Sequence, residues 1–116
     1  MRKNNYGRDW ELKICSYLEE KGMNILERNF TIKGGETDII AVSGEYICFI
    51  EVKFRSDRAV DAYSSVGYKK QRRIIKSAEK YLFETNCGLQ PRFDVVFIFS
   101  DGENAVLDYI ENAYGG

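Results

Sequence analysis

Apolar residues recur along this 116-residue chain with two different spacings, and these predict where helices and strands alternate. Spacings of three and four residues, typical of one helix face, run from Gly7 to Lys21 and from Tyr68 to Glu84. Gly22 is the expected C-terminal cap of the first helix. Alternating or continuous apolar runs predict five strands, over residues 24–32, 36–43, 46–54, 93–99 and 105–110.

This order of elements predicts the fold class. Three strands followed by a helix and a nearly continuous apolar strand indicate an antiparallel meander, joined by a right-handed crossover to a further buried strand. We therefore expect a single α/β domain over residues 1–116, with helices packed on a mixed β-sheet in the order α-β-β-β-α-β-β. A domain of this length buries about two-thirds of its unfolded surface, which is enough for a core.

The second and third predicted strands carry acidic residues where a simple hairpin would carry neutral ones. Between these strands, Gly44-Glu45 suits a two-residue hairpin turn, because glycine is favoured in its first position. Such a turn makes Ser43 face Tyr46 and so sets the register of the hairpin. The same register pairs Asp38 with Glu51, Thr37 with Val52 and Glu36 with Lys53.

Side chains alternate along a strand, so Asp38, Glu51 and Lys53 are expected on one face. Facing carboxylates repel each other, more strongly as the site becomes drier. A hard cation such as Mg²⁺ (or Mn²⁺) would relieve this repulsion, with oxygen ligands from Asp38, Glu51 and the carbonyl of Val52. Lys53 could then orient or help deprotonate a metal-bound water, or stabilise transition-state charge. The alternative is a solvated face on which these residues and Glu36 only form ion pairs.

One polar residue lies on the apolar stripe of each predicted helix. Glu11 shares a helix face with Ile14 and Leu18, and Gln71 shares one with Ile74. Two polar groups on inward-facing stripes, together with an acidic pair on the sheet, indicate a pocket. The alternative for each residue is a helix-end side chain that reaches solvent.

The absence of histidine restricts the chemistry. It excludes Ser-His-Asp and Cys-His nucleophiles, histidine-based nucleases and almost every transition-metal site. Cys15, Cys48 and Cys87 form no CxxC pair, and the first two fall on apolar faces, so we expect reduced core residues. No signal peptide or membrane span is recognisable, so a cytoplasmic protein without a membrane partner is expected. Any chemistry must use carboxylates, lysines, tyrosines or an oxygen-bound metal.

Charge is distributed unevenly along the chain. Residues 53–80 contain nine basic and three acidic residues, a net +6, and since the whole chain carries −1, the remainder carries −7. A localised basic region on an otherwise acidic domain suggests a localised anionic partner. The stretch 56–67 with Tyr63 is either a loop that touches the substrate or a solvated loop. The basic residues expected to contact nucleic acid are Arg55, Lys69, Lys70, Arg72 and Arg73.

Four sequence blocks carry a resemblance to a known family. The blocks "GGETDIIA", "FIEVKFR", "KKQRRIIKSAEKYL" and "RFDVVFI" resemble the YraN-like family of small bacterial proteins, which is placed among the PD-(D/E)XK nucleases, and the match covers nearly the whole chain. The spacing of Asp38, Glu51 and Lys53 is similar to the signature of that superfamily, although Thr37 replaces its proline. A more distant similarity is to archaeal Holliday-junction resolvases, whose helix-one glutamate corresponds to Glu11.

The resemblance implies a restriction-endonuclease-like core and Mg²⁺-dependent hydrolysis of phosphodiester bonds in DNA. It implies that Asp38 and Glu51 bind the metal, that Lys53 is catalytic, and that Glu11 and Gln71 support them. The expected function is an endonuclease acting on branched or otherwise structured DNA. The alternatives are a nucleic-acid-binding or adaptor module with little or no catalysis and, more weakly, a protein-interaction domain using the acidic C-terminal end. Related resolvases work as dimers, but no residue here indicates a dimer surface.

Overall fold

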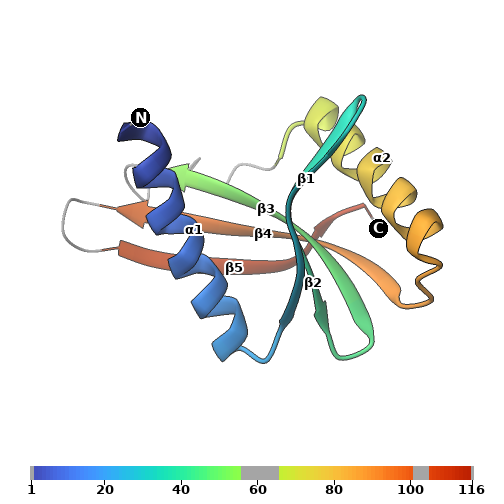
Figure 1. Ribbon diagram of the computed structural model, residues 1–116, viewed down its shortest axis with the longest axis horizontal. Helices are drawn as coiled ribbons and strands as arrows, with labels where there is room; N and C mark the ends of the chain where they lie inside the picture. Colours follow the sequence, from blue (N-terminus) through green and yellow to red (C-terminus); the bar gives the residue numbers. More distant parts are fainter. Residues whose placement is uncertain (1, 56–65, 101–104, 116) are drawn as a thin grey trace.

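A computed structural model describes residues 2–55, 66–100 and 105–115, with residues 2–9 and 100 described by their backbone (Figure 1). The predicted order of elements, α-β-β-β-α-β-β, is confirmed. The elements are α1 (Arg2–Glu20), β1 (Asn24–Ile32), β2 (Gly35–Ser43), β3 (Tyr46–Arg55), α2 (Tyr68–Thr85), β4 (Gln90–Ser100) and β5 (Ala105–Tyr114).

The five strands form one sheet in the order β1-β2-β3-β4-β5. The pairs β1-β2, β2-β3 and β4-β5 are antiparallel, whereas β3 and β4 are parallel. The chain reaches β4 from β3 through α2, as a parallel neighbour requires. The predicted mixed sheet with helices packed on it is therefore confirmed.

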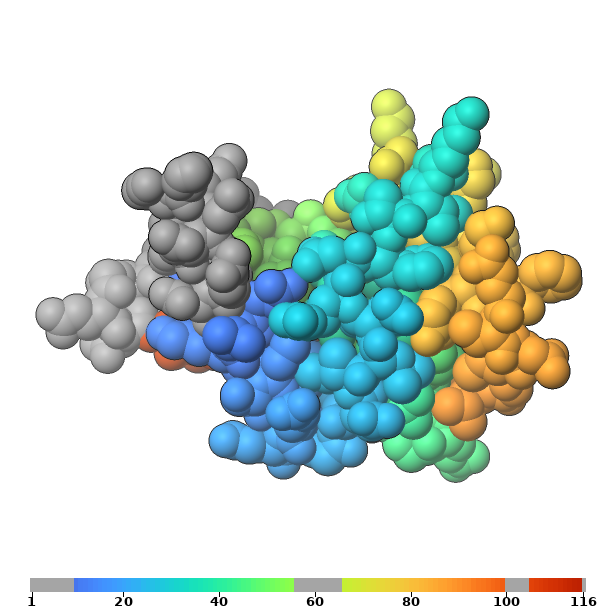
Figure 2. Space-filling view, in the orientation of Figure 1, coloured from blue at the N-terminus to red at the C-terminus, as the bar shows by residue number. Residues whose placement is uncertain are grey.

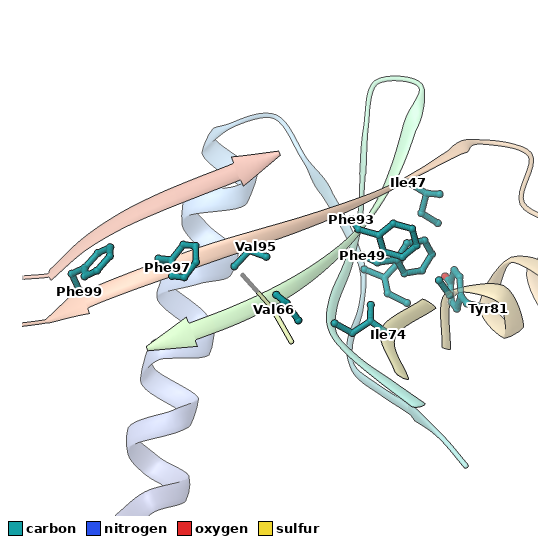
Figure 3. Close-up of a cluster of buried hydrophobic side chains, with 11 residues drawn as sticks. Ile47, Phe49, Val66, Ile74, Tyr81, Phe93, Val95, Phe97 and Phe99 are labelled. Carbon is teal, nitrogen blue, oxygen red and sulfur yellow. The ribbon is translucent and has the colours of Figure 1, made fainter. Parts of the chain in front are cut away.

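Buried apolar side chains form two clusters, one on each face of the sheet. Ile39 belongs to the cluster with α1, and its neighbour Ile40 belongs to the cluster with α2. Because successive strand residues point to opposite faces, the two helices cover opposite faces of the sheet. Figure 3 shows the α2 cluster, in which the rings of Phe49, Phe93 and Tyr81 meet. The helices supply Trp10, Ile14 and Leu18 to the first cluster and Ile74, Ala78 and Tyr81 to the second.

Three elements extend well beyond their predicted bounds. α1 begins at Arg2 rather than Gly7, β4 spans Gln90–Ser100 rather than residues 93–99, and β5 continues to Tyr114 rather than ending at Ile110. The β4-β5 register shifts between the pairs Val95–Ile110 and Phe93–Tyr114, where β5 contains the additional residues. The added residues of these elements are largely polar, so apolar periodicity could not reveal them. No helix in the described part of the chain has the length and apolar character needed to cross a membrane.

The cysteines are free, as expected. Cys48 is fully buried on the α1 face, and burial raises the pKa of its thiol to about 12. Cys15 and Cys87 are half-buried. The prediction that Cys15 and Cys48 are core residues is therefore confirmed for Cys48, whereas Cys15 is only half-buried.

The β2-β3 turn is the predicted one. Gly44 has a positive φ of 61°, and Ser43 pairs with Tyr46. The register continues as predicted as far as Ile39, which pairs with Ile50. Beyond this pair, β2 remains paired only with β1, and Figure 1 shows the β1-β2 hairpin diverging from β3 toward α2. The two strands that carry the acidic residues therefore separate where those residues lie.

Packing of α2 against the start of β2 explains this divergence. A Cβ atom at Gly35 would lie 2.6 Å from the carbonyl oxygen of Arg73, so only glycine allows such close contact. Next to it, the hydroxyls of Thr37 and Ser77 share a buried hydrogen bond of 2.6 Å. β2 is thus drawn to the helix. The predicted pairs of Asp38 with Glu51, of Thr37 with Val52 and of Glu36 with Lys53 are all absent from the described sheet.

Candidate active site

Asp38 lies where β2 and β3 separate. Its Oδ2 accepts a hydrogen bond of 2.8 Å from the main-chain N–H of Val52. A carboxylate thus replaces a sheet hydrogen bond and joins the two strands after their regular pairing has ended. This bond places the carboxylate of Asp38 beside Glu51, the residue that precedes Val52 on β3.

Glu51 is the buried member of the carboxylate pair, with only 4% of its surface exposed. Its Oε2 lies 3.6 Å from Lys53 Nζ and 3.7 Å from Lys70 Nζ, whereas its Oε1 is buried without a hydrogen-bond partner. Burial, followed by the negative charge of Asp38, raises the pKa of Glu51 to about 7, although the two lysines act in the opposite direction. Burial and the second carboxylate therefore outweigh the two nearby ammonium groups at Glu51.

Glu36 anchors two basic residues of α2 next to this pair. Its Oε2 accepts a hydrogen bond of 2.7 Å from Lys70, and its Oε1 accepts one of 3.1 Å from Arg73. These bonds hold the pKa of Glu36 below its ordinary value. The pKa of Lys70 is raised above its ordinary value. Burial acts to lower this pKa, but the hydrogen bond to Glu36 and the negative charge of Glu51 together outweigh the effect of burial. Lys70 is therefore an ammonium held between two acidic residues.

Lys70 is predicted from sequence only as a nucleic-acid contact, whereas the structure places its Nζ 3.7 Å from Glu51. A signal was present, because Lys70, Ile74, Ser77 and Tyr81 follow one another at spacings of four, three and four residues. These spacings define one helix face. The last three residues are buried in the structure, so the first must also face the sheet.

The other predicted site residues lie apart from this group. Glu11 is on α1, accepts a hydrogen bond of 2.6 Å from Asn29 and forms an ion pair with Arg28 at 3.8 Å. Its pocket is lined otherwise by residues 25–29 of β1. Gln71 donates a 2.8 Å hydrogen bond to the carbonyl of Val66 at the start of α2. The contacts described for these two side chains do not include Asp38 or Glu51.

The predicted nucleic-acid contacts are mostly on the first two turns of α2. Lys69 and Arg72 are exposed, and Arg72 donates a hydrogen bond of 3.1 Å to Tyr68. Arg55 lies at the end of β3, with its guanidinium 5.7 Å from the ring centre of Phe97. The start of α2 lies beside the tip of the β1-β2 hairpin (Figure 2). Tyr63 and most of the predicted loop lie outside the described residues.

The donor atoms at this site suit a hard cation. Among the residues that the structure describes, no three acidic, cysteine or histidine side chains form a group that could hold a metal ion. A cation at this site would have to be held by the predicted ligands alone, which are Asp38, Glu51 and the carbonyl of Val52. Mg²⁺ commonly takes one or two carboxylates and completes its shell with water and substrate phosphate. Glu51 Oε1, which is buried without a hydrogen-bond partner, is suited to coordinate such a cation.

Comparison with known proteins identifies the family. A family profile described as "Uncharacterised protein family UPF0102" matches residues 10–98. The chain belongs to UPF0102. This is the YraN family to which the sequence blocks pointed.

Relatives over nearly the full length support the assignment. A UPF0102 protein from Myxococcus xanthus is 37% identical over 114 residues, which are 97% of this chain and 90% of the relative. Another, from Carboxydothermus hydrogenoformans, is also 37% identical and covers 97% of each chain. One from Chlorobium chlorochromatii is 41% identical over 78% of this chain and 70% of its own. The UPF0102 match includes the whole carboxylate and lysine group.

The raised pKa of Glu51 predicts how the stability of this UPF0102 protein depends on pH. A glutamate whose pKa rises from 4.5 to about 7 on folding binds more protons in the native state. Its contribution to stability is therefore present below pH 4.5 and is lost as the pH rises through 7. Because glutamine resembles the protonated acid, Glu51→Gln should match the wild type near pH 4 and exceed it by about 2–3 kcal/mol at pH 8.

Urea unfolding in EDTA between pH 4 and pH 8 measures this difference. Glu45→Gln, in the exposed β2-β3 turn, controls for the loss of one carboxylate. A stability difference between Glu51→Gln and the wild type that stays constant over this pH range would contradict the prediction.

Proposed function

We propose that this UPF0102 protein is a metal-dependent nuclease that hydrolyses phosphodiester bonds in branched or otherwise structured DNA. The observation that carries the proposal is the buried Glu51, placed beside Asp38 with one carboxylate oxygen unpartnered and the ammonium of Lys53 3.6 Å away. Burying such a pair costs stability, so a fold retains it where the charges have a use. The resemblance to PD-(D/E)XK nucleases supports the same chemistry.

In this proposal Asp38, Glu51 and the Val52 carbonyl would hold Mg²⁺ or Mn²⁺. When bound, such an ion acts as a Lewis acid toward the phosphodiester and supports attack by water. Lys53 presents its positive charge beside Glu51 and would stabilise the negative charge that develops on the phosphate. The exposed Lys69 and Arg72 would bind the phosphates of the DNA backbone.

A second candidate is a DNA-binding or adaptor module that keeps this fold without turnover. It is favoured by the contacts of Glu11, which are made with Asn29 and Arg28 rather than with the carboxylate pair. Such a module would still bind a cation weakly through its two carboxylates. It would bind DNA through the basic residues of α2. The two candidates differ in whether a DNA strand is cut.

Cleavage of synthetic DNA tests the proposal. A four-way junction and a linear duplex of the same sequence are incubated with the wild type in Mg²⁺, Mn²⁺ or EDTA. Cleavage is expected with either metal and not in EDTA, and Lys53→Met should slow it by about 100-fold, because one transition-state charge partner is lost. Lys80→Met, which removes an exposed lysine paired with Glu84, should cut normally.

Two results would count against the nuclease. Undiminished cleavage by repurified Lys53→Met would indicate a contaminating enzyme or another site. DNA binding by the wild type without cleavage in either metal would favour the adaptor module instead.

A further inference from the structure

Lys70 bridges the two acidic parts of the site. Its Nζ lies 2.7 Å from Glu36 Oε2 and 3.7 Å from Glu51 Oε2. The helix face that it shares with Ile74 and Ser77, both fully buried, directs it toward the sheet. Its position is thus imposed by the packing of α2 rather than by a chance surface contact.

We propose that Lys70 is the resident counter-ion of the carboxylate pair, which competes with the divalent cation for Glu51 and binds a DNA phosphate once that cation is bound. This inference rests on the proposed function and deepens it. It assigns to Lys70 a role that links the two ligands of the site.

Without a cation, Glu51 depends on its lysine neighbours. A buried carboxylate beside a second one is costly unless positive charge lies close by. Lys53 and Lys70 both approach Oε2 of Glu51 and leave its Oε1 without a partner. The two ammonium groups therefore stabilise the site only in part, and a divalent cation can replace one of them.

A divalent cation at the carboxylate pair would repel the ammonium of Lys70. Two unit charges a few ångströms apart in a partly dry site interact by several kcal/mol, so the cation and Lys70 cannot share Glu51 without cost. Lys53 follows Glu51 on β3, but Lys70 reaches the site from a separate helix. Its long, flexible stem lets it withdraw toward Glu36.

Glu36 keeps the displaced ammonium close to the substrate. The group has three N–H donors, and Glu36 takes one of them at 2.7 Å. The remaining donors can form charge-assisted hydrogen bonds with a phosphate next to the metal site. Since the cation frees Lys70 for the phosphate, each ligand should strengthen the binding of the other.

Calorimetric titration with Mn²⁺ tests the competition. Lys70→Met should bind Mn²⁺ about five- to tenfold more tightly than the wild type, because a nearby positive charge is removed. Lys80→Met makes the same change of charge at an exposed residue near the far end of α2 and should alter the affinity less than about twofold. Equal affinities for Lys70→Met and Lys80→Met would overturn the inference.

Fluorescence anisotropy with a labelled four-way junction tests the coupling. Saturating Ca²⁺ should raise the DNA affinity of the wild type by about tenfold and that of Lys70→Met by no more than about twofold. An equal rise in both would overturn the inference. If the wild type binds no divalent cation, the proposed function and the inference both fail. If the wild type binds metal and cuts DNA while Lys70→Met behaves like Lys80→Met, only the inference fails.

A measurement on the unaltered protein covers the case in which Lys70→Met folds poorly. The ammonium signal of Lys70 in ¹H–¹⁵N NMR spectra should shift when Mg²⁺ is added, whereas that of Lys80, paired with Glu84 at the far end of α2, should not. A Lys70 signal that is unaffected by saturating Mg²⁺ would overturn the inference.

Discussion

Asp38→Asn is expected to lower the rate of Mg²⁺-dependent DNA cleavage by about a thousandfold and to abolish the heat of Mn²⁺ binding. Asparagine can still accept the hydrogen bond that Val52 donates at 2.8 Å, so the junction of β2 and β3 should survive. It lacks the negative charge, and a neutral amide is a poor ligand for a hard cation held by only two carboxylates. Activity should therefore fall without unfolding.

Cleavage assays and calorimetry on the same protein preparations measure these two effects. Glu45→Gln, which removes a carboxylate from an exposed turn, should behave like the wild type in both. Cleavage by Asp38→Asn at the wild-type rate would contradict the assignment of the metal site. Retained Mn²⁺ heat with lost cleavage would indicate that Asp38 acts on the substrate rather than on the metal.

Asp94→Ala is expected to cause the largest loss of stability, about 3–5 kcal/mol, for a reason unconnected with the active site. Asp94 on β4 is fully buried and accepts hydrogen bonds from Arg92, from the Tyr109 hydroxyl at 2.6 Å and from the Asn112 main-chain N–H at 2.9 Å. Burial and the bond to Asp94 raise the pKa of Tyr109, so its hydroxyl stays a donor. Removing the carboxylate leaves several β5 and β4 donors without a partner.

Urea unfolding monitored by circular dichroism measures this loss. The double change of Arg92→Met and Asp94→Leu removes both charges and should be less destabilising than Asp94→Ala, because no buried charge is left unpaired. A loss below about 1 kcal/mol in Asp94→Ala would show that the donors find other partners.

The local features of the fold could be predicted from sequence because they depend on neighbouring residues. The Gly44-Glu45 turn was sufficient for the β2-β3 register as far as Ile39 and Ile50. The apolar residues could not have set this register by themselves, because the paired parts of β2 and β3 are buried on both faces. Sequence blocks likewise led to the UPF0102 family.

The composition of the site depended on contacts between distant residues. β2 separates from β3 because α2 packs against Gly35 and Thr37 of β2. The helix residues that make these contacts, Arg73 and Ser77, lie about 40 positions further along the chain. The same contact brings Lys70 between Glu36 and Glu51. Periodicity shows which face of a helix is buried, but not which strand it meets.

The sequence by itself therefore determined the order of the elements, the hairpin and the choice of Asp38, Glu51 and Lys53 as candidate site residues. The tertiary structure alone decided that Lys70 and Glu36 accompany them and that Glu11 contacts β1. The physical reason is range: turns and alternation act over a few residues, whereas the electrostatic environment of a buried carboxylate is set by every charge that packing brings near it.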